Sequence, residues 1–342
     1  MNFTVQLTTR DNQELSFVCN SKQTLIEAAE TASIILPTQC RKGGCGTCIA
    51  NIVTGNYEFG SHNPGVMPSD NPNAVLMCRT YPRSDITLSL PTDYNTILFN
   101  AIPRQEAIIE QLEIIADNTV HLKLQLQQDA NGNIAATFEP GQFMTIEIPN
   151  TNDRRTYSLA NTSNSDGKLE FLIRLQIKGI GSDFFRQQAQ VGTKLVLHGP
   201  QGNFKLDANS SHPRWFVAGG TGIAPILSML RHAAEMQDMQ AAHLFFGVNR
   251  ENELFGSDIL QDLQAQLPQL QMTVCVWKPQ NDWRGFIGTP ADAFQQALAQ
   301  TNIQPDVYLC GPPLLLDAAE KIALTAGIPQ TQIFVERFLP SG

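Results

Sequence analysis

The sequence predicts a multidomain fold, in which a small α+β domain is followed by a β-rich domain of barrel or sandwich type and by an α/β domain with a parallel sheet. Three observations lead to this prediction. The 342 residues are too many for one ordinary core. Short strand patterns crowd the middle of the chain, and strand and helix patterns alternate after His212. We place the domains at residues 1–98, 99–208 and 209–342.

The first domain opens with a compact strand, strand and helix pattern. Two β-rich runs at residues 3–7 and 14–19 flank a turn-like segment, and a capped helix is predicted over residues 24–32. A loop rich in Gly and Cys follows, and the run ITLSLP ends the segment near Pro91. Pro103 marks a linker, which places the first boundary near residue 100.

The two later domains differ in the order of their predicted strands and helices. Between residues 105 and 207, Asn, Gly, Pro and Asp turns separate short strands, as is typical of a barrel or sandwich. These strands are IIEQLEII, VHLKLQLQ, QFMTIEIP, RTYSLA, LEFLIRLQ and KLVLHG. After His212, strands such as RWFVAGG, AHLFFGV and DVYLCG alternate with helices such as IAPILSMLRHAAEM and LLLDAAEKIALTAG. That alternation predicts a parallel sheet covered by helices.

Composition narrows the class of protein. The chain is 42% apolar and 16% charged, which is ordinary for a globular protein. Its net charge of −9 argues against nucleic acid as a partner, because neutralising phosphates needs clustered Lys and Arg. The first residues lack a basic segment followed by an apolar stretch, and no apolar run reaches the length of a spanning helix. We therefore expect a cytoplasmic protein without a membrane partner.

The strongest chemical signal is a cysteine loop with the spacing C-x4-C-x2-C, completed by a later cysteine. This spacing is the one that holds a plant-type [2Fe–2S] cluster by four thiolates. The predicted ligands are Cys40, Cys45, Cys48 and Cys78. A structural zinc site is the alternative, but such sites commonly use two C-x2-C pairs and this loop has one. Cys19, at a strand end, is predicted to be a small buried core residue.

A short strand after residue 153 carries three chemistries that a flavin needs. The Arg155 guanidinium can pair with a pyrophosphate, the Tyr157 ring can stack on an isoalloxazine, and the Ser158 hydroxyl can reach the ring edge near N5. Alternation on a strand puts Arg155 and Tyr157 on one face. An ordinary exposed strand is the alternative interpretation.

A second stretch supports a flavin because it ends a strand and opens a helix, whose N-terminus can bind phosphate. Its predicted binding residues are Arg174, Gly179, Gly181 and Ser182. Ser182 could instead be a plain N-cap, a role that is compatible with phosphate binding.

The third motif, G-G-T-G-I-A-P, follows one predicted strand directly and precedes a helix, the context in which a glycine turn indicates a dinucleotide site. Its predicted cofactor-binding residues are Gly219, Gly220, Thr221, Gly222 and Pro225. A second turn, Cys310 with Gly311 and Pro312, again joins a strand to a helix and is predicted to face the same crevice. Cys310 could lie beside the nicotinamide, or it could simply pack in the core.

The choice of coenzyme depends on the segment after the next strand. A carboxylate there accepts hydrogen bonds from a ribose 2′-hydroxyl, and a cation favours a 2′-phosphate. Glu251 and Arg250 are both present. We predict NADH with Glu251 as the ribose ligand, while Arg250 leaves NADPH open and a solvated loop of mixed charge is the simpler alternative.

In this order, the cysteine loop, R-x-Y-S, G-G-T-G-I-A-P and C-G-P-P resemble the oxygenase reductases that join a plant-type ferredoxin to a ferredoxin–NADP reductase-like module. The resemblance covers the whole chain. It implies a β-grasp ferredoxin domain, an antiparallel β-barrel FAD domain and an α/β parallel-sheet NAD domain. Four further segments, residues 78–82, 138–144, 169–174 and 335–342, are similar to the reductase components of soluble methane monooxygenases.

The resemblance also implies a function. FAD would be held by the R-x-Y-S strand and the residue 179–182 turn, NADH by the two later turns, and Glu336 and Phe338 would reach the flavin. With Ser158 and Cys310 they form the predicted catalytic set. Hydride would pass from NADH to FAD, and single electrons would continue through the [2Fe–2S] cluster to the hydroxylase component of a di-iron monooxygenase. We expect the chain to be a monomer.

Two rival functions use the same motifs. The acceptor could be a Rieske aromatic-ring dioxygenase or another di-iron hydroxylase acting on phenol, alkanes or alkenes. A redox-sensing module without turnover is the rival from another class. Residues 61–75, which carry Asp70 as their only acid, and Lys42 depart from the methane pattern, so the docking face for the partner is not predicted.

Overall fold

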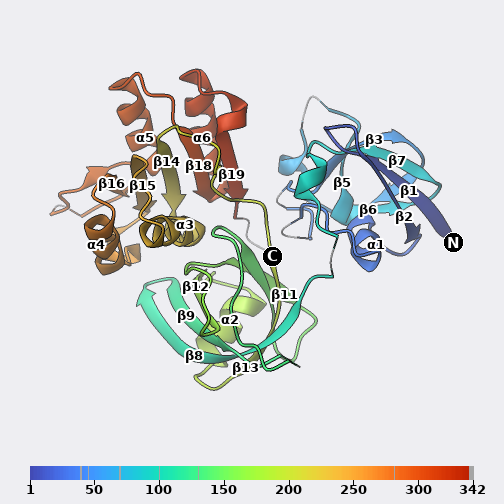
Figure 1. Ribbon diagram of the computed structural model, residues 1–342, viewed down its shortest axis with the longest axis horizontal. Helices are drawn as coiled ribbons and strands as arrows, with labels where there is room; N and C mark the ends of the chain where they lie inside the picture. The colour runs from blue at the N-terminus through green and yellow to red at the C-terminus, as the bar shows by residue number, and fades with distance from the viewer. Residues whose placement is uncertain are drawn as a thin grey trace. The chain divides into compact units, whose positions relative to one another are not determined.

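The computed structural model describes residues 1–38, 41–44, 46–68, 71–99, 101–129, 131–280 and 282–338. The chain forms two compact units (Figure 1). Unit 1 contains Met1–Pro103 and Gln201–Asn203, and unit 2 contains Arg104–Pro200 and Phe204–Phe338. Within the described ranges, no helix combines the length and the apolar composition that crossing a bilayer requires.

Unit 1 is a mixed sheet with one helix packed against it, the β-grasp fold. The sheet order is β2-β1-β7-β3-β5, with β1 antiparallel to β2 and parallel to β7. Helix α1 begins as predicted, because Thr24 accepts from the Glu27 amide and Glu27 bonds back to the Thr24 amide, forming a capping box. The elements are β1 (Asn2–Thr8), β2 (Glu14–Asn20), α1 (Leu25–Thr31), β3 (Ile49–Thr54), β4 (Tyr57–Phe59), η1 (Pro64–Val66), β5 (Ala74–Leu76), η2 (Met77–Arg79), β6 (Thr80–Pro82), β7 (Ile86–Ser89) and η3 (Tyr94–Thr96).

The long loop that the sequence predicts after α1 contains strands that the prediction missed. β3 pairs with β5 and β7, and β4 pairs with β6. These strands are short, and β4, β5 and β6 have only three residues each. A period-2 pattern cannot be recognised over three residues, so their formation depends on tertiary pairing.

The first half of unit 2 is a closed antiparallel barrel of six strands in the order β11-β10-β13-β8-β9-β12. The isolated bridge between Leu159 and Phe171 joins its two ends, β11 and β12. This resolves the choice between barrel and sandwich that the sequence left open. The elements are β8 (Arg104–Ala116), β9 (Thr119–Leu126), β10 (Phe143–Glu147), β11 (Arg154–Ser158), β12 (Lys168–Arg174), α2 (Ile180–Gln187) and β13 (Lys194–Gln201).

The second half of unit 2 is an all-parallel sheet in the order β17-β16-β15-β14-β18-β19. The predicted alternation of strands and helices is confirmed. The elements are β14 (Arg214–Gly219), η4 (Gly220–Gly222), α3 (Ile223–Glu235), β15 (Ala242–Val248), η5 (Glu251–Glu253), α4 (Ser257–Gln266), β16 (Leu270–Val276), β17 (Phe286–Ile287), α5 (Pro290–Ala299), β18 (Asp306–Gly311), α6 (Pro313–Thr325), η6 (Gln330–Gln332) and β19 (Ile333–Arg337).

Successive side chains along these strands point to opposite faces of the sheet and so contribute to two hydrophobic cores. Phe216 and Phe246 pack with α3 and α4 on one face, while Trp215 and Phe245 pack with α5 and α6 on the other (Figure 1). The core on the α3 face also contains residues of the barrel half, namely Ala160, Leu172 and Phe204. The barrel and the parallel sheet therefore share one core.

Candidate functional site

Gly181 of α2 brings the predicted flavin side chains Arg155 and Tyr157 together. A Cβ at position 181 would lie 3.0 Å from Arg155 Cγ and 3.3 Å from the Tyr157 hydroxyl oxygen. Arg155 is only 8% exposed, and its Nη1 donates to Asp153 Oδ1 at 3.0 Å. Burial raises the pKa of Tyr157, so its phenol stays neutral. This corner joins a buried cation to an aromatic ring, as a flavin nucleotide requires.

The N-terminus of α2 lies at the same corner. Its N-cap is Gly179, whose φ is +147° and around whose absent Cβ no described atom lies within 4 Å. No side chain caps this end of the helix in the described structure. The N-cap interpretation of Ser182 is wrong: Ser182 is the third helical residue, and its Oγ accepts from the Gln176 amide at 2.8 Å. An uncapped turn of amides beside Arg155 fits a phosphate group.

The two glycine-containing turns of the parallel sheet interlock, because β14 and β18 are neighbours. A Cβ at Gly222 would lie 2.4 Å from the Cys310 carbonyl oxygen, and one at Gly219 would lie 2.8 Å from Pro312 Cδ. The prediction that both turns meet at the carboxyl ends of the strands is confirmed. Backbone therefore approaches backbone here at distances that only glycine allows.

Other predicted cofactor-binding residues lie in or beside the first of these turns. Gly220 has a φ of +55°, and the position of its absent Cβ lies 3.6 Å from Arg174 Nη1. Arg174, at the end of β12, thus lies beside the turn that the sequence predicts to bind a dinucleotide. Thr221 is 7% exposed, and Pro225 lies in the first turn of α3, where its missing N–H leaves no bond unmade.

Ser158, Cys310 and Glu336 converge from three distant segments of the chain. The register of β18 with β19 places Cys310 opposite Glu336, and Ser158 Oγ lies 3.5 Å from Glu336 Oε2. Phe338 follows Glu336 by two residues, and its amide donates to the Gly311 carbonyl at 3.0 Å. The predicted catalytic set therefore lies together where β11 of the barrel meets the end of the parallel sheet.

The electrostatics of this convergence are unusual. Burial raises the pKa of Glu336 to about 8, so the carboxyl keeps its proton at neutral pH and can donate a hydrogen bond. Burial, and above about pH 8 the charge that Glu336 then carries, raises the pKa of Cys310 well above its ordinary value. The Cys310 thiol is therefore not a nucleophile, and both groups remain neutral.

The loop predicted to select the coenzyme is held from two sides. Glu251 Oε1 accepts from the Gln280 amide at 2.5 Å, so one of its carboxylate oxygens is already used within the protein. The Asn252 carbonyl accepts from the Asp117 amide at 3.1 Å, which ties the loop to the β8–β9 turn of the barrel. Arg250, in extended conformation, precedes η5.

In unit 1, Cys48 and Cys78 are 1% and 3% exposed and lie on adjacent segments, since the Met77 amide donates to the Cys48 carbonyl at 3.0 Å. Gly43 and Gly46 have φ of +74° and +77°, so the loop needs the freedom that these glycines give. Two buried cysteines on adjacent segments, near such a loop, fit a cluster held by thiolates. The other predicted ligands, Cys40 and Cys45, lie outside the described residues, as does Asp70.

A polar network that the sequence does not predict lies at the junction of barrel and parallel sheet. The Glu170 carboxylate of β12 lies 2.9 Å from Arg231 Nη1 of α3 and 2.9 Å from His121 Nε2 of β9. The sequence contained one signal for it: α3 is apolar on most of its surface but carries Ser228, Arg231 and Glu235 on one face.

Comparisons with known proteins agree with this architecture. Residues 8–83 match the family described as 2Fe-2S iron-sulfur cluster binding domain, residues 106–206 match the oxidoreductase FAD-binding domain, and residues 216–321 match the oxidoreductase NAD-binding domain. A solved cytochrome P450 reductase of Amycolatopsis has the same fold, with a TM-score of 0.80 and 23% identity over 99% of this chain and 100% of that one.

Two curated relatives are more informative. The methane monooxygenase component C of Methylosinus trichosporium is 41% identical over 254 residues, which are 73% of this chain and 74% of that protein. The anthranilate 1,2-dioxygenase electron transfer component of Acinetobacter baylyi is 31% identical over 348 residues, which cover 100% of this chain and 98% of that protein. The chain therefore belongs to the family of oxygenase reductase components, iron–sulfur flavoproteins that oxidise NADH with FAD and a [2Fe–2S] cluster as cofactors.

Proposed function

We propose that this chain is the NADH-dependent reductase component of a multicomponent di-iron monooxygenase, with methane monooxygenase as the favoured system. The observation that carries the proposal is the buried convergence of Ser158, Cys310 and Glu336 beside the two glycine turns. The similarity to methane monooxygenase component C supports the choice of partner. A di-iron hydroxylase component would then receive the electrons.

For the flavin site, we assign Arg155 and the α2 N-terminus, with Gly179, Gly181 and Ser182, to the FAD pyrophosphate. Tyr157 would stack on the ring, and Ser158 would hydrogen-bond its edge. FAD accepts a hydride and releases electrons singly, and the [2Fe–2S] cluster carries one electron at a time. The protonated Glu336 holds a proton next to Ser158, and Phe338 would reach the flavin from the end of β19.

For the coenzyme, we assign the two interlocked turns to the NADH pyrophosphate and nicotinamide. The residues are Gly219, Gly220, Thr221, Gly222, Pro225, Gly311 and Pro312. Arg174 supplies a cation beside Gly220, and Cys310 supplies a small neutral wall. Glu251 would use its second oxygen for the ribose 2′-hydroxyl, which favours NADH over NADPH. For the cluster we assign Cys40, Cys45, Cys48 and Cys78.

The test is anaerobic titration of the purified protein with NADH. We expect a flavin-plus-iron–sulfur absorption spectrum that NADH bleaches, NADPH bleaching much more slowly, and steady reduction of cytochrome c. A protein that holds the cofactors but does not turn over would be the redox-sensing module instead. A spectrum without both cofactors would disprove the assignment altogether.

A Rieske-type aromatic-ring dioxygenase is the second candidate acceptor. The full-length similarity to the anthranilate dioxygenase component favours it, because that match spans the whole chain. Pull-down of the terminal oxygenase with the holoprotein as bait decides between them. Recovery of a di-iron hydroxylase supports the first proposal, and recovery of a Rieske protein replaces it with the second.

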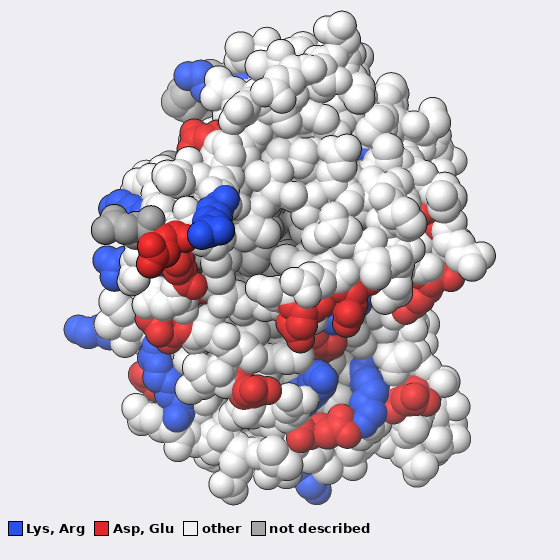
Figure 2. Space-filling model, turned by 90° about the vertical axis from the view of Figure 1, so that its left-hand side faces the viewer, with Lys and Arg blue, Asp and Glu red and all other residues white. Residues whose placement is uncertain are grey.

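We further propose that the protein acts as a cytoplasmic monomer, with domains at residues 1–98, 99–208 and 209–342, and that it uses neither a membrane nor nucleic acid. On the face that Figure 2 shows, the lysines and arginines of the described residues stand singly or beside acids rather than in a continuous stripe. Such a surface, on a chain of net charge −9, gives a polyphosphate little to bind.

Glu336→Gln is expected to change how stability depends on pH. Burial raises the pKa of Glu336 from 4.5 to about 8, so in this window the folded protein keeps a proton that the unfolded chain has lost. The free energy of unfolding of the unaltered protein therefore falls as the pH rises through the window, by about 3 kcal/mol between pH 5.5 and pH 8.5, and levels off above it. Thermal unfolding at about pH 5.5 and pH 8.5 measures this. The Gln variant should lose less stability, and equal losses would contradict the assignment.

A further inference from the structure

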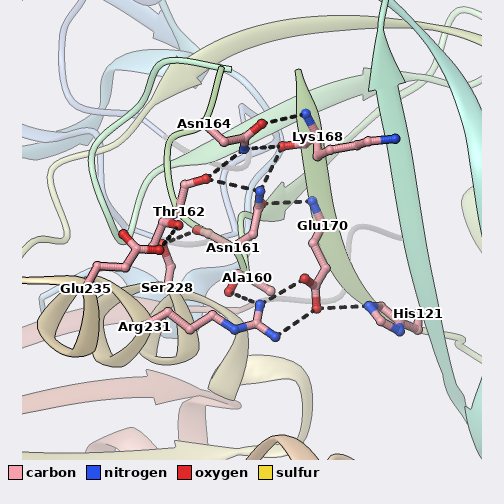
Figure 3. A network of polar contacts seen from close by, with 10 residues as sticks. All are labelled: His121, Ala160, Asn161, Thr162, Asn164, Lys168, Glu170, Ser228, Arg231 and Glu235. Carbon is pink, nitrogen blue, oxygen red and sulfur yellow. Dashed lines mark hydrogen bonds and ion pairs between the residues drawn. The ribbon is translucent and has the colours of Figure 1, made fainter. Parts of the chain in front are cut away.

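The face of α3 that carries Ser228, Arg231 and Glu235 is joined to the barrel by polar contacts (Figure 3). Ser228 Oγ donates to the Asn161 carbonyl at 2.6 Å, and Glu235 Oε1 accepts from the Thr162 hydroxyl at 2.5 Å. Arg231 Nη1 lies between these contacts along the helix and donates to the Ala160 carbonyl at 2.8 Å. One turn after another, the helix is thus tied to the segment that connects β11 with β12.

Arg231 makes more of these hydrogen bonds than Ser228 or Glu235. Its Nη1 lies 2.9 Å from Glu170 Oε2 and its Nη2 lies 3.3 Å from Glu170 Oε1, a two-pronged ion pair. His121 Nε2 approaches the same carboxylate at 2.9 Å from β9 (Figure 3). The Glu170 side chain is 13% exposed and that of Arg231 is 23% exposed. The ion pair is therefore largely removed from solvent. Away from water its hydrogen bonds are electrostatically stronger, so they hold the two side chains in this geometry.

The charge on Glu170 is maintained by its neighbours. Burial alone would raise the pKa of this carboxyl, but the His121 hydrogen bond and the Arg231 charge outweigh burial and bring it to about 2. Glu170 is therefore ionised throughout the physiological range, and the ion pair does not open with pH.

Both ends of this network adjoin the proposed reaction centre. α3 begins at Ile223, directly after the Gly220–Gly222 turn, and Ala160 follows Ser158 by two residues. Glu170 lies on β12, whose last residue, Arg174, approaches Gly220. A displacement of α3 along the barrel would thus move the coenzyme turn relative to the flavin strand.

We propose that Arg231 is a positioning residue for hydride transfer. This proposal rests on the function proposed above. Arg231 fixes α3, and with α3 the coenzyme turn, against the β11–β12 segment that adjoins the proposed flavin site. Arg231 touches neither cofactor in this assignment and acts through the backbone that it holds. Because hydride transfer is sensitive to displacements of about 1 Å, a loosened helix should slow the chemical step more than it weakens coenzyme binding.

The test is anaerobic stopped-flow reduction of the flavin by NADH in the holoprotein. For Arg231→Ala we expect the limiting rate of flavin reduction at saturating NADH to fall about tenfold or more. The dissociation constant for NADH should stay within about threefold of that of the unaltered protein. The long-wavelength charge-transfer band of the NADH complex should weaken as well. Arg231→Lys keeps a charge but not the fork, and should recover part of the rate.

Lys168→Ala is the matched control. Lys168 lies on β12, the strand of Glu170, and its ion pair with Glu110 of β8 is exposed, with side chains 44% and 47% exposed. Among the contacts shown in Figure 3, the Lys168 side chain makes none with α3. The limiting rate and charge-transfer band of Lys168→Ala should equal those of the unaltered protein.

If Arg231→Ala does not fold, the double variant Glu170→Leu with Arg231→Met replaces the pair by apolar groups of similar size, which proteins often tolerate. A folded variant of either kind that retains the full rate and charge-transfer band overturns the proposal. Failure of the proposed function would be distinct, because NADH would then not bleach the flavin of the unaltered protein either.

Discussion

Replacing Cys48 with alanine will remove the iron–sulfur cluster and lower NADH-dependent reduction of cytochrome c by about two orders of magnitude or more. A methyl group cannot bond iron, and three thiolates do not hold a plant-type cluster. NADH should still bleach the flavin within about threefold of the normal rate, since unit 2 has cores of its own. Iron analysis and stopped-flow absorbance measure the two effects on one preparation.

Cys19→Ala is the control for this variant. Cys19 belongs to the same unit 1 core as Cys48 and is 0% exposed, and burial raises the pKa of its thiol to about 11. It is a core residue, as the sequence predicts. Its alanine variant should therefore keep its iron and its cytochrome c activity, while a Cys48→Ala protein that did the same would refute the ligand assignment.

Replacing Gly222 with alanine will lower the rate of flavin reduction by NADH by about a hundredfold. The added Cβ would lie 2.4 Å from the Cys310 carbonyl oxygen and 2.7 Å from Gly311 Cα, both backbone atoms that cannot rotate away. The two turns must therefore separate, which displaces the coenzyme site on both strands. Dithionite, which needs no coenzyme site, should reduce the flavin of the variant normally.

Gly65→Ala is the corresponding control for the added methyl group. Gly65 has no positive φ, and the nearest atom to its absent Cβ is Asn63 Oδ1 at 3.4 Å, an ordinary contact. This variant should be reduced by NADH at the unaltered rate. Normal NADH kinetics in Gly222→Ala would show that the interlocked turns do not hold the coenzyme.

The sequence predicts the parallel sheet of unit 2 well because its strands are buried on both faces and its helices are amphipathic. β15 and β18 were expected over residues 242–248 and 306–311, the ranges that the structure has. Where strands are short, as in β4 to β6, local pattern carries too little information and pairing with distant segments decides.

For the site, motif spacing identifies the candidate binding residues but does not show which of them come into contact. Arg155 and Gly181 are predicted separately, and only barrel closure brings them within reach of each other. Glu170 lies in the residue 169–174 segment that carries the resemblance, but the resemblance implies no role for it, and Arg231 lies outside every segment singled out in the sequence. Their ion pair exists because a helix of one half rests on a strand of the other, and that arrangement depends on the whole core.

The core that the barrel shares with the parallel sheet limits how this reductase can be rebuilt by recombination. A chimaera joined near residue 208 would pair foreign helices with Ala160, Leu172 and Phe204, which are buried beside Ile226 and Leu227 of α3. Apolar surface left without its partner costs about 25 cal/mol per Å². The two halves of unit 2 should therefore be exchanged between reductases as one piece.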